Sequence, residues 1–348
     1  MQPPLPGPSA FQPRQVNEAN RKVIISINPL AGRGKADANV SRLRDLLFQA
    51  GFDVHVLTDL AEIAELAASF RQAGELRAVV AAGGDGTVAE LVNRCEPEVP
   101  ITTLPQGTEN LLAKYLGIAS TPDSVARVVC KGAIVHLDAG LARCAATPGA
   151  ALGTFSRVFL LMASCGLDAD VVHRLHQERS GPIRHWSYVK PIWQAVRNYK
   201  YPELRISCDG DPRGAARHED SAPRFHPGDH SARWMFLFNL PCYAWGLNFT
   251  PAASGFDGLL DLCSLRQGAL LHGMRYLAAV VGKQLDVLSD CVTGQITRLS
   301  VDCDVPAPCQ FDGDPGGFSP LEIHVLPRRL TLLAPREWAS ERIPDTVE

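Results

Sequence analysis

Residues 78–87 read AVVAAGGDGT, an apolar run followed by a glycine-rich turn built around a single acid, Asp85. A short apolar run bounded by turn residues is typical of a buried strand, and the stretch after the turn, through about Cys95, is predicted to be a helix. Two other strand-like runs, 23–27 and 101–104, also end in glycine-containing turns. The chain therefore has three turns of one kind at the ends of successive strands.

Helical segments separate these strands. Apolar residues before Gly51 recur at helical spacing, and residues 52–57 form another strand-like run. An alanine-rich helix over about 60–72 follows an N-cap at Thr58-Asp59. Strands that alternate with helices predict a parallel, doubly wound (Rossmann-like) α/β sheet. Ligands of such sheets bind at the carboxyl ends of the strands, which is where the three turns lie.

The pattern changes near residue 133, after which strand-like runs separated by Gly, Pro and Asp dominate. We expect helices at about 166–178, 186–199 and 268–281, and a polar loop over 209–231. This pattern predicts a β-rich second domain of the sandwich kind. The expected divisions are a disordered lead-in, an α/β domain, a β-rich domain and a tail that returns to the first domain, at 1–20, 21–142, 143–326 and 327–348.

The composition is that of an ordinary globular protein. The chain has 348 residues and a formal net charge of −3, so its length indicates two domains and its charge gives no sign of nucleic-acid binding. No apolar run approaches the ~18 residues that a spanning helix needs. Ten cysteines, none in a C-x-x-C pair, favour reduced thiols. We therefore expect a cytoplasmic protein that is soluble or peripheral to a membrane.

The glycine-rich turns have a chemistry of their own. Glycine lets backbone amides approach a phosphate group, and the N-terminus of the following helix adds partial positive charge. A carboxylate such as Asp85 beside a phosphate is repelled unless it meets Mg²⁺ or accepts a proton. Thr87 is expected to cap the helix and to reach a phosphate oxygen. The alternative for Asp85 is an acid that merely caps its own loop.

Two more acidic turns come late in the chain, Asp257-Gly258 and Asp312-Gly313-Asp314. The two carboxylates of the second turn, kinked by the glycine between them, are able to point into one cleft. An Asp-Gly pair is also typical of a plain hairpin turn, which is the alternative for the first. A solvated turn is the alternative for the second.

Together these motifs resemble those of the lipid kinase superfamily that includes diacylglycerol, sphingosine and ceramide kinases and their bacterial relatives. The signature loop is GGDGTVAEL at 83–91. The other matching blocks are Asn28-Pro29 with Gly32 and Ala36, LPQGTEN at 104–110, MASCGLDADVV at 162–172, Ser254 with GFDGLLDL at 255–262, and FDGDP at 311–315. GGDG[TS] alone also fits NAD kinases and phosphofructokinases, whereas the third loop with the late acidic segments favours lipid kinases.

The resemblance implies an ATP- and Mg²⁺-dependent kinase with a nucleotide-binding first domain and a substrate- and metal-binding second domain. It implies transfer of the ATP γ-phosphate to a hydroxyl of diacylglycerol, a sphingoid base or a related lipid. It also implies a Mg²⁺ site made by the Asp257 carboxylate with oxygens of Ser254 and Leu259, supported by Asp261. The residues implied to contact ATP are Asn28, Pro29, Leu30, Ala31, Gly32, Thr58, Gly84, Asp85, Gly86, Thr87, Val88, Ala89, Glu90 and Thr108.

The candidate catalytic residues are Asp314, Asp85 and Asp312. The family usually has DGE where this chain has DGD, and its final acid is a proposed proton acceptor. Asp314, which is one methylene shorter, takes that place, with Asp85 as the alternative base. Two further departures are Glu109, at a loop position that is often small, and Leu111, where many diacylglycerol kinase relatives carry Asp. The second departure counts against diacylglycerol as the acceptor.

Basic and aromatic residues interleave between Arg174 and Arg205 and include Trp186 and Trp193, a composition that suits an anionic membrane surface. A helix with a packed aromatic face is the alternative. We expect a lipid acceptor, a transient membrane contact and no nucleic acid, and leave the oligomeric state open, a homodimer included. Two other functions stay open, a small-molecule kinase of the NAD kinase kind and an inactive nucleotide- or lipid-binding regulator.

Overall fold

The computed structural model describes residues 14–15, 17, 19–28, 35–178, 189–210 and 229–342. Pro29, Leu30, Ala31 and Gly32 of the first turn lie outside these residues, as do the expected lead-in up to Pro13 and the centre of the predicted polar loop. The chain divides into two compact units, one formed by 1–137 with 327–348 and the other by 138–326. Each unit is described by itself.

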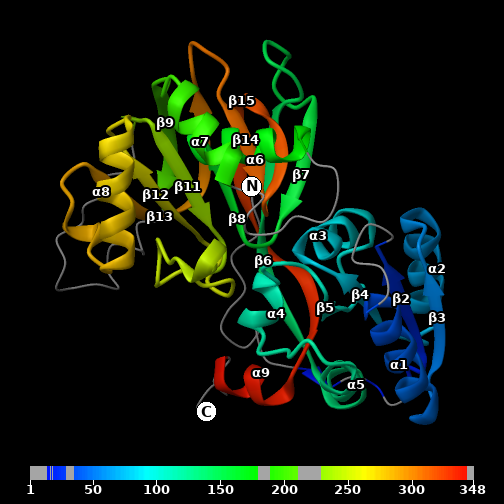
Figure 1. Ribbon diagram of the computed structural model, residues 1–348. Coiled ribbons are helices and arrows are strands. Elements are labelled where there is room, and N and C mark those ends of the chain that lie inside the picture. The colour runs from blue at the N-terminus through cyan, green and yellow to red at the C-terminus, as the bar shows by residue number, and fades with distance from the viewer. Residues whose placement is uncertain are drawn as a thin grey trace. The chain divides into compact units, whose positions relative to one another are not determined.

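The first unit contains the predicted parallel sheet (Figure 1). Its strands, in the spatial order β3-β2-β4-β5, are β2 (Lys22–Ile27), β3 (Asp53–Leu57), β4 (Leu76–Gly83) and β5 (Ile101–Pro105). Every residue of β4 is buried, as expected for a central strand with helices on both faces. The prediction of a doubly wound α/β domain is confirmed.

Four helices of this unit pack against one another in two pairs. Helix α1 (Lys35–Gln49) packs against α5 (Pro122–Lys131), and α2 (Leu60–Gln72) packs against α3 (Asp85–Arg94). The short helix α4 (Leu111–Tyr115) follows the turn after β5. Asp59 caps α2 as predicted, because its carboxylate accepts the backbone N–H groups of Ala61 and Glu62 at 2.8 and 3.0 Å. The strand order reverses between β2 and β4, and ligands of such sheets bind at the carboxyl ends of the strands at this switch point.

The end of the chain returns to this sheet. Strand β15 (Asp314–Ala334) pairs in parallel with β5 through Leu332 and Ile101. The last helix, α9 (Arg336–Arg342), buries Trp338 and Ala339.

The second unit is antiparallel and β-rich. Its strands are β6 (Ala133–Ala145), β7 (Phe155–Phe159), β8 (Met162–Cys165), β9 (Leu204–Gly210), β10 (His230–Ala232), β11 (Trp234–Phe238), β12 (Leu260–Leu265), β13 (Cys291–Asp302), β14 (Pro308–Phe311) and β15. Pairing runs β13-β12-β11-β8-β14-β15 and returns from β15 to β13, so these six strands close on themselves. They enclose one apolar core that includes Phe159, Leu237, Ile296 and Phe311. The predicted sandwich-like domain is confirmed.

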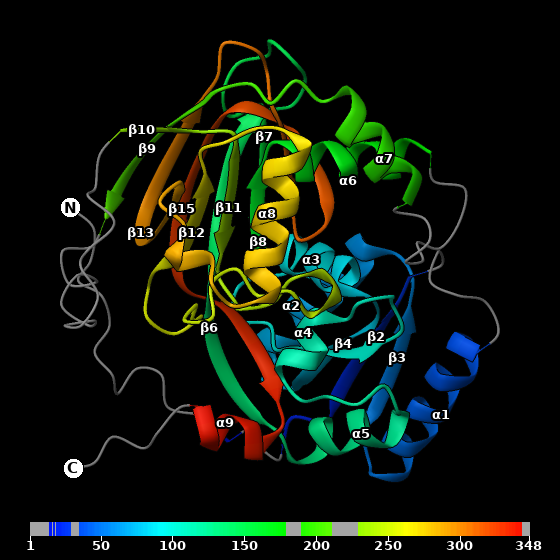
Figure 2. The same ribbon diagram turned by 60° about the vertical axis from the view of Figure 1, so that its left-hand side comes forward.

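Among the described residues of this unit, the α-helices are α6 (Leu167–Gln177), α7 (Val189–Asn198) and α8 (Leu270–Val281). Figure 2 shows α8 lying along one face of the second unit's sheet. All ten cysteines carry free thiols. Within the described part of the chain, no helix is long and apolar enough to cross a bilayer.

Candidate active site

The turn after β4 begins its helix earlier than the sequence suggested. Asp85 is the first residue of α3, and Gly84 occupies the N-cap position without a side chain to cap the helix. The prediction that Thr87 caps this helix is therefore wrong. Thr87, the third residue of α3, is buried, and its hydroxyl accepts a hydrogen bond from the Asn28 side chain at 3.3 Å. This bond joins the residue that follows β2 to the first turn of α3.

Asp85 ties two turns together. Its carboxylate accepts the backbone N–H groups of Leu111 and Leu112 at 2.9 and 3.0 Å, so it caps α4 from outside that helix. Burial raises the pKa of Asp85, although the two backbone N–H groups lower it. The role that this geometry favours is holding the turn after β5 against the turn after β4.

The backbones of these two turns touch. A Cβ atom built on Gly107 would lie 2.6 Å from the Gly84 Cα atom, and one on Gly84 would lie 3.1 Å from the Gly107 Cα atom. Gln106 donates its N–H to the Gly83 carbonyl at 2.8 Å. The left-handed residue Asn110 closes the second turn through two 2.8 Å hydrogen bonds to the Gly107 backbone. Glycine at 107 is therefore a steric requirement, and a side chain at 84 would press against the same backbone.

The other residues expected to contact ATP differ in whether their side chains are exposed to a ligand. The side chains of Val88 and Ala89 are buried and face the core, so they offer a nucleotide no side-chain contact. Glu90 pairs with Arg94 on the exposed side of α3 at 3.3 Å. Thr58 directly precedes the N-cap of α2, and Thr108 is exposed in the turn after β5.

The departure at Glu109 has a local explanation. Its carboxylate lies 3.3 Å from the Lys114 ammonium, one helical turn away on α4. The Lys114 ammonium thus balances the negative charge of Glu109, which would otherwise repel a nearby phosphate.

In the second unit, the acidic turn between β14 and β15 is tightly fixed. Asp312 adopts a left-handed conformation, and its carboxylate accepts the backbone N–H groups of Leu160, Leu161 and Met162 at 2.8, 2.7 and 3.1 Å. Burial raises the pKa of Asp312 to about 6, although these donors favour the ionised form. Asp312 is therefore an anchor for the turn.

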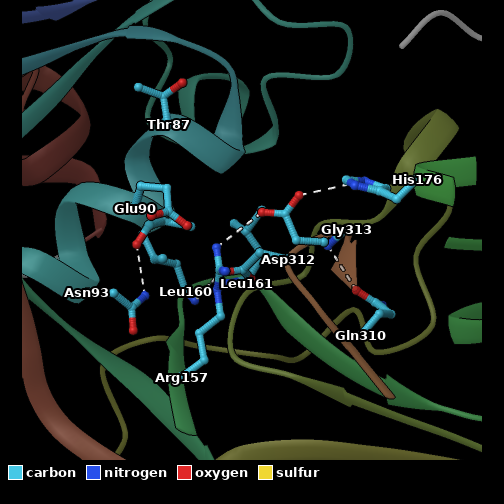
Figure 3. A network of polar contacts seen from close by, with 12 residues as sticks. Thr87, Glu90, Asn93, Arg157, Leu160, Leu161, His176, Gln310, Asp312 and Gly313 are labelled. Atoms are coloured by element: carbon cyan, nitrogen blue, oxygen red, sulfur yellow. Dashed lines mark hydrogen bonds and ion pairs between the residues drawn. The ribbon is translucent and has the colours of Figure 1, made fainter. Parts of the chain in front are cut away.

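Asp314 is held by side chains. Its carboxylate lies 3.1 Å from Arg157 Nη2 and 3.8 Å from His176 Nε2. Figure 3 shows Arg157 and His176 approaching the turn from opposite sides. The Asp314 side chain is 31% exposed, so solvent reaches it. Sequence reasoning missed both partners, because Arg157 comes from β7 and His176 from α6.

A buried polar network holds the backbone of the turn between β14 and β15. Gln310 accepts the Gly313 N–H at 2.8 Å, as Figure 3 shows, and its amide nitrogen lies 3.0 Å from both Ser164 Oγ and Asp168 Oδ2. Asp168 also accepts a hydrogen bond from the Tyr243 hydroxyl. This network fixes the Gly313 backbone and with it the direction of the residue that follows.

The predicted metal site lies at the start of β12. Asp257 accepts the Leu259 N–H at 3.0 Å and the Gln295 side-chain amide at 3.2 Å. Ser254 belongs to the same loop. No group of three or more His, Cys, Asp or Glu side chains suited to a metal occurs among the described residues.

Two further acids accompany Asp257. Asp261 is buried, and its Oδ2 atom has no hydrogen-bond partner. The wholly buried Asp138, which the sequence reasoning missed, accepts the Gly258 N–H at 2.7 Å. Carboxylate oxygens are the ligands that Mg²⁺ prefers, and a cation would satisfy the orphaned Asp261 oxygen. Asp257 and Asp261 therefore fit the implied metal.

The ionisation of Asp261 predicts a pH effect on stability. Burial and the neighbouring charge of Asp257 raise its pKa from 3.8 to about 7. The folded protein then holds a proton that the unfolded chain has lost, so stability should fall as pH rises from about 4 to about 7. The shift corresponds to on the order of 4 kcal/mol. Urea unfolding between pH 5 and 8 should show the part of this loss that falls above pH 5, roughly 3 kcal/mol, and excess Mg²⁺ should reduce it.

The variant Asp261→Asn separates this effect from other titrations. It should remove most of the decline between pH 5 and 8 and abolish the Mg²⁺ rescue. A variant with the wild-type pH slope would show that Asp261 is already ionised at pH 5.

Comparison with known proteins places the two units in one family. Residues 22–142 match the diacylglycerol kinase catalytic domain, and residues 162–334 match the YegS C-terminal NAD kinase beta sandwich-like domain. The two matches together span most of the chain. The protein belongs to the diacylglycerol kinase and sphingosine kinase superfamily.

Individual relatives are distant. A diacylglycerol kinase of Bacillus subtilis strain 168 is 23% identical and covers 92% of this chain and 99% of its own length. An uncharacterized Synechocystis protein is also 23% identical, with 93% and 75% covered. A crystal structure of a diacylglycerol kinase from Bacillus anthracis str. Sterne matches with a TM-score of 0.60 at 17% identity, over 91% of this chain and 98% of the other. This structural likeness shows the fold.

Proposed function

We propose that this protein is an ATP-dependent lipid kinase that transfers the γ-phosphate to a lipid hydroxyl. The observation that carries the proposal is the backbone contact between Gly84 and Gly107. This contact joins the turns that follow β4 and β5, at the carboxyl edge of a parallel sheet. Such thin, amide-lined turns suit a polyphosphate. Family membership and a relative named diacylglycerol kinase support kinase chemistry with a lipid acceptor.

The residues divide the work in this proposal. The turn from Gly84 to Thr87 and the exposed Thr108 bind the phosphates, and the N-terminus of α3 adds partial positive charge. Asp257 and Asp261 would hold Mg²⁺, which supplies charge neutralisation when bound. Phosphoryl transfer needs little covalent help from the protein, so positioning and charge stabilisation provide most of the catalysis.

Asp314 is the proposed proton acceptor for the attacking hydroxyl. Of the three candidate acids, Asp85 and Asp312 have both carboxylate oxygens occupied by backbone N–H groups. The Asp314 carboxylate faces side chains and solvent instead. A base must reach the proton that it removes, so accessibility favours Asp314.

Arg157 is expected to position this base. The variant Arg157→Ala should lower turnover by roughly ten- to a hundredfold, because a displaced catalytic group costs rate without weakening nucleotide binding. Steady-state kinetics should show the loss in kcat with an unchanged KM for ATP, and Arg157→Lys should recover part of it. A change confined to KM for ATP would instead place Arg157 in nucleotide binding.

The acceptor is tested directly by phosphate transfer from labelled ATP. The purified protein is offered vesicles containing diacylglycerol, sphingosine or a total lipid extract, and in parallel NAD. We expect labelled lipid and no labelled NAD. Labelled NAD alone would make this a small-molecule kinase, and ATP binding without transfer to any acceptor would indicate a regulator.

A further inference from the structure

Helix α8 is attached to the second unit by a narrow face. Gly273 lies against the Trp234 ring, where an added Cβ atom would come within 3.3 Å of it. Tyr276 and Val280, three and seven residues further on, are buried. The Tyr276 hydroxyl donates to Asp290 at 2.7 Å and accepts the Gln267 N–H at 3.1 Å. These contacts fix which side of α8 faces outward.

The outward side of α8 is apolar. Leu271, Met274 and Val281 are 77%, 59% and 68% exposed, and Leu270 and Leu277 are half exposed. At ~100° per residue these side chains form one stripe that covers roughly 120° of the helix. Soluble surfaces rarely gather large apolar side chains in this way without a binding partner.

The charged residues on α8 and just beyond its two ends are basic, and one of them is paired with an acid from outside the helix. From 262 to 285 the sequence contains Arg266, Arg275 and Lys283 and no acidic residue. Arg266 and Lys283 are exposed just beyond the two ends of the helix, and Arg275 lies on its flank, paired with Asp290 at 2.8 Å. An apolar stripe with a basic fringe matches the apolar interior and anionic headgroups of a bilayer surface.

A hollow of about 520 Å³ opens where the stripe begins. It is lined by Lys200, Tyr201, Arg233 and the segment from Gln267 to Leu270. Two cationic side chains thus stand beside the first leucine of the stripe, Lys200 and Arg233, and Arg233 also lies 3.6 Å from the Glu203 carboxylate. This is where the phosphate of an anionic lipid would lie if α8 rested on a membrane.

We propose that the outer face of α8 is the surface by which this protein docks on membranes that contain anionic phospholipid. The apolar stripe enters the interfacial layer, and Arg266, Lys283 and the basic hollow meet the headgroups. The purpose of this contact rests on the proposed function, since a lipid kinase must collect its acceptor from a bilayer.

A second copy of the chain is a poorer occupant of the same face. In a two-fold symmetric pair each face meets its own copy, so the basic fringes would oppose one another. With no acid between 262 and 285 to meet them, that arrangement brings like charges together.

The docking surface differs from the one suggested by the sequence. Of the basic and aromatic segment between 174 and 205, α7 exposes Trp193 by 61%, with the Arg197 guanidinium over its ring at 5.3 Å. The alternative prediction, that the aromatic side chains of this helix are packed, is therefore wrong at Trp193. Trp186 lies outside the described residues, and α8 offers the broader apolar surface.

The test is co-flotation with vesicles of phosphatidylcholine alone or with 30 mol% (about a third) phosphatidylglycerol. The double variant Leu271→Glu/Met274→Glu should bind the anionic vesicles at least about tenfold more weakly, because two charges would enter the apolar layer. Phe48→Glu is the matched control, since Phe48 is a 74% exposed apolar residue on α1. It should bind like the wild type.

Unchanged vesicle binding of the double variant overturns the proposal. A dimeric wild type that the double variant converts to a monomer, measured by sedimentation, also overturns it and makes the face an interface between copies. Failure of the kinase proposal is separately visible. In that case the wild type floats with vesicles but phosphorylates no lipid in them.

Discussion

Asp314→Asn should lower the rate of phosphate transfer by roughly 10²–10⁴-fold, the usual contribution of a positioned general base. The amide keeps the shape of the side chain and its oxygen still accepts a hydrogen bond from Arg157, which lies 3.1 Å from the carboxylate in the wild type. It cannot take the hydroxyl proton. The loss should therefore appear in single-turnover measurements with saturating ATP, while the dissociation constant for ATP stays unchanged.

The matched control is Asp304→Asn. Asp304 also pairs with an arginine, Arg205 at 2.8 Å, but on the exposed surface of the same unit. Exposed pairs of this kind contribute at most about 1 kcal/mol, so this variant should keep wild-type turnover. If Asp314→Asn also retains its turnover, Asp314 is not the base. Asp85→Asn would then be the next variant to measure.

Gly107→Ala should weaken nucleotide binding about tenfold or more. The new methyl group would lie 2.6 Å from the Gly84 Cα atom, which is backbone and cannot rotate away. The turns after β4 and β5 must then separate, at a cost of about 1–3 kcal/mol typical of overpacking. Because each 1.4 kcal/mol is a factor of ten in affinity, the dissociation constant for ATP should rise about tenfold or more. Isothermal titration calorimetry measures this directly.

A second glycine of the same unit provides the control. Gly117 has a left-handed φ of 67°, and a Cβ atom added there would have no heavy atom within 4 Å, so the Cβ atom of Gly117→Asn meets open space. Asparagine tolerates the left-handed region, so nucleotide affinity should be kept. Equal losses in both variants would point to a general loss of stability. Wild-type affinity in Gly107→Ala would remove these turns from the nucleotide site.

The sequence carried most of the fold because its signals are local. Apolar runs ending in glycine-rich turns marked β2, β4 and β5, helical spacing before Gly51 marked α1, and the N-cap at Asp59 marked α2. Prediction from the sequence was less reliable within the turns. Whether Thr87 caps α3 depends on where the helix begins, and the N-cap at Gly84 shows that it begins at Asp85.

The sequence by itself determined the family, the two domain types, the three glycine-rich turns and the two acidic turns, since each is written in neighbouring residues. Only the tertiary structure decided which acid is accessible. Asp314 is separated by 157 positions from Arg157, and no local pattern relates them. The same holds for α8, whose composition fits a buried helix until the contacts of Gly273 and Tyr276 show that its leucines face outward. Side-chain partners and exposed faces arise from how distant segments pack, and this information is spread over the whole chain.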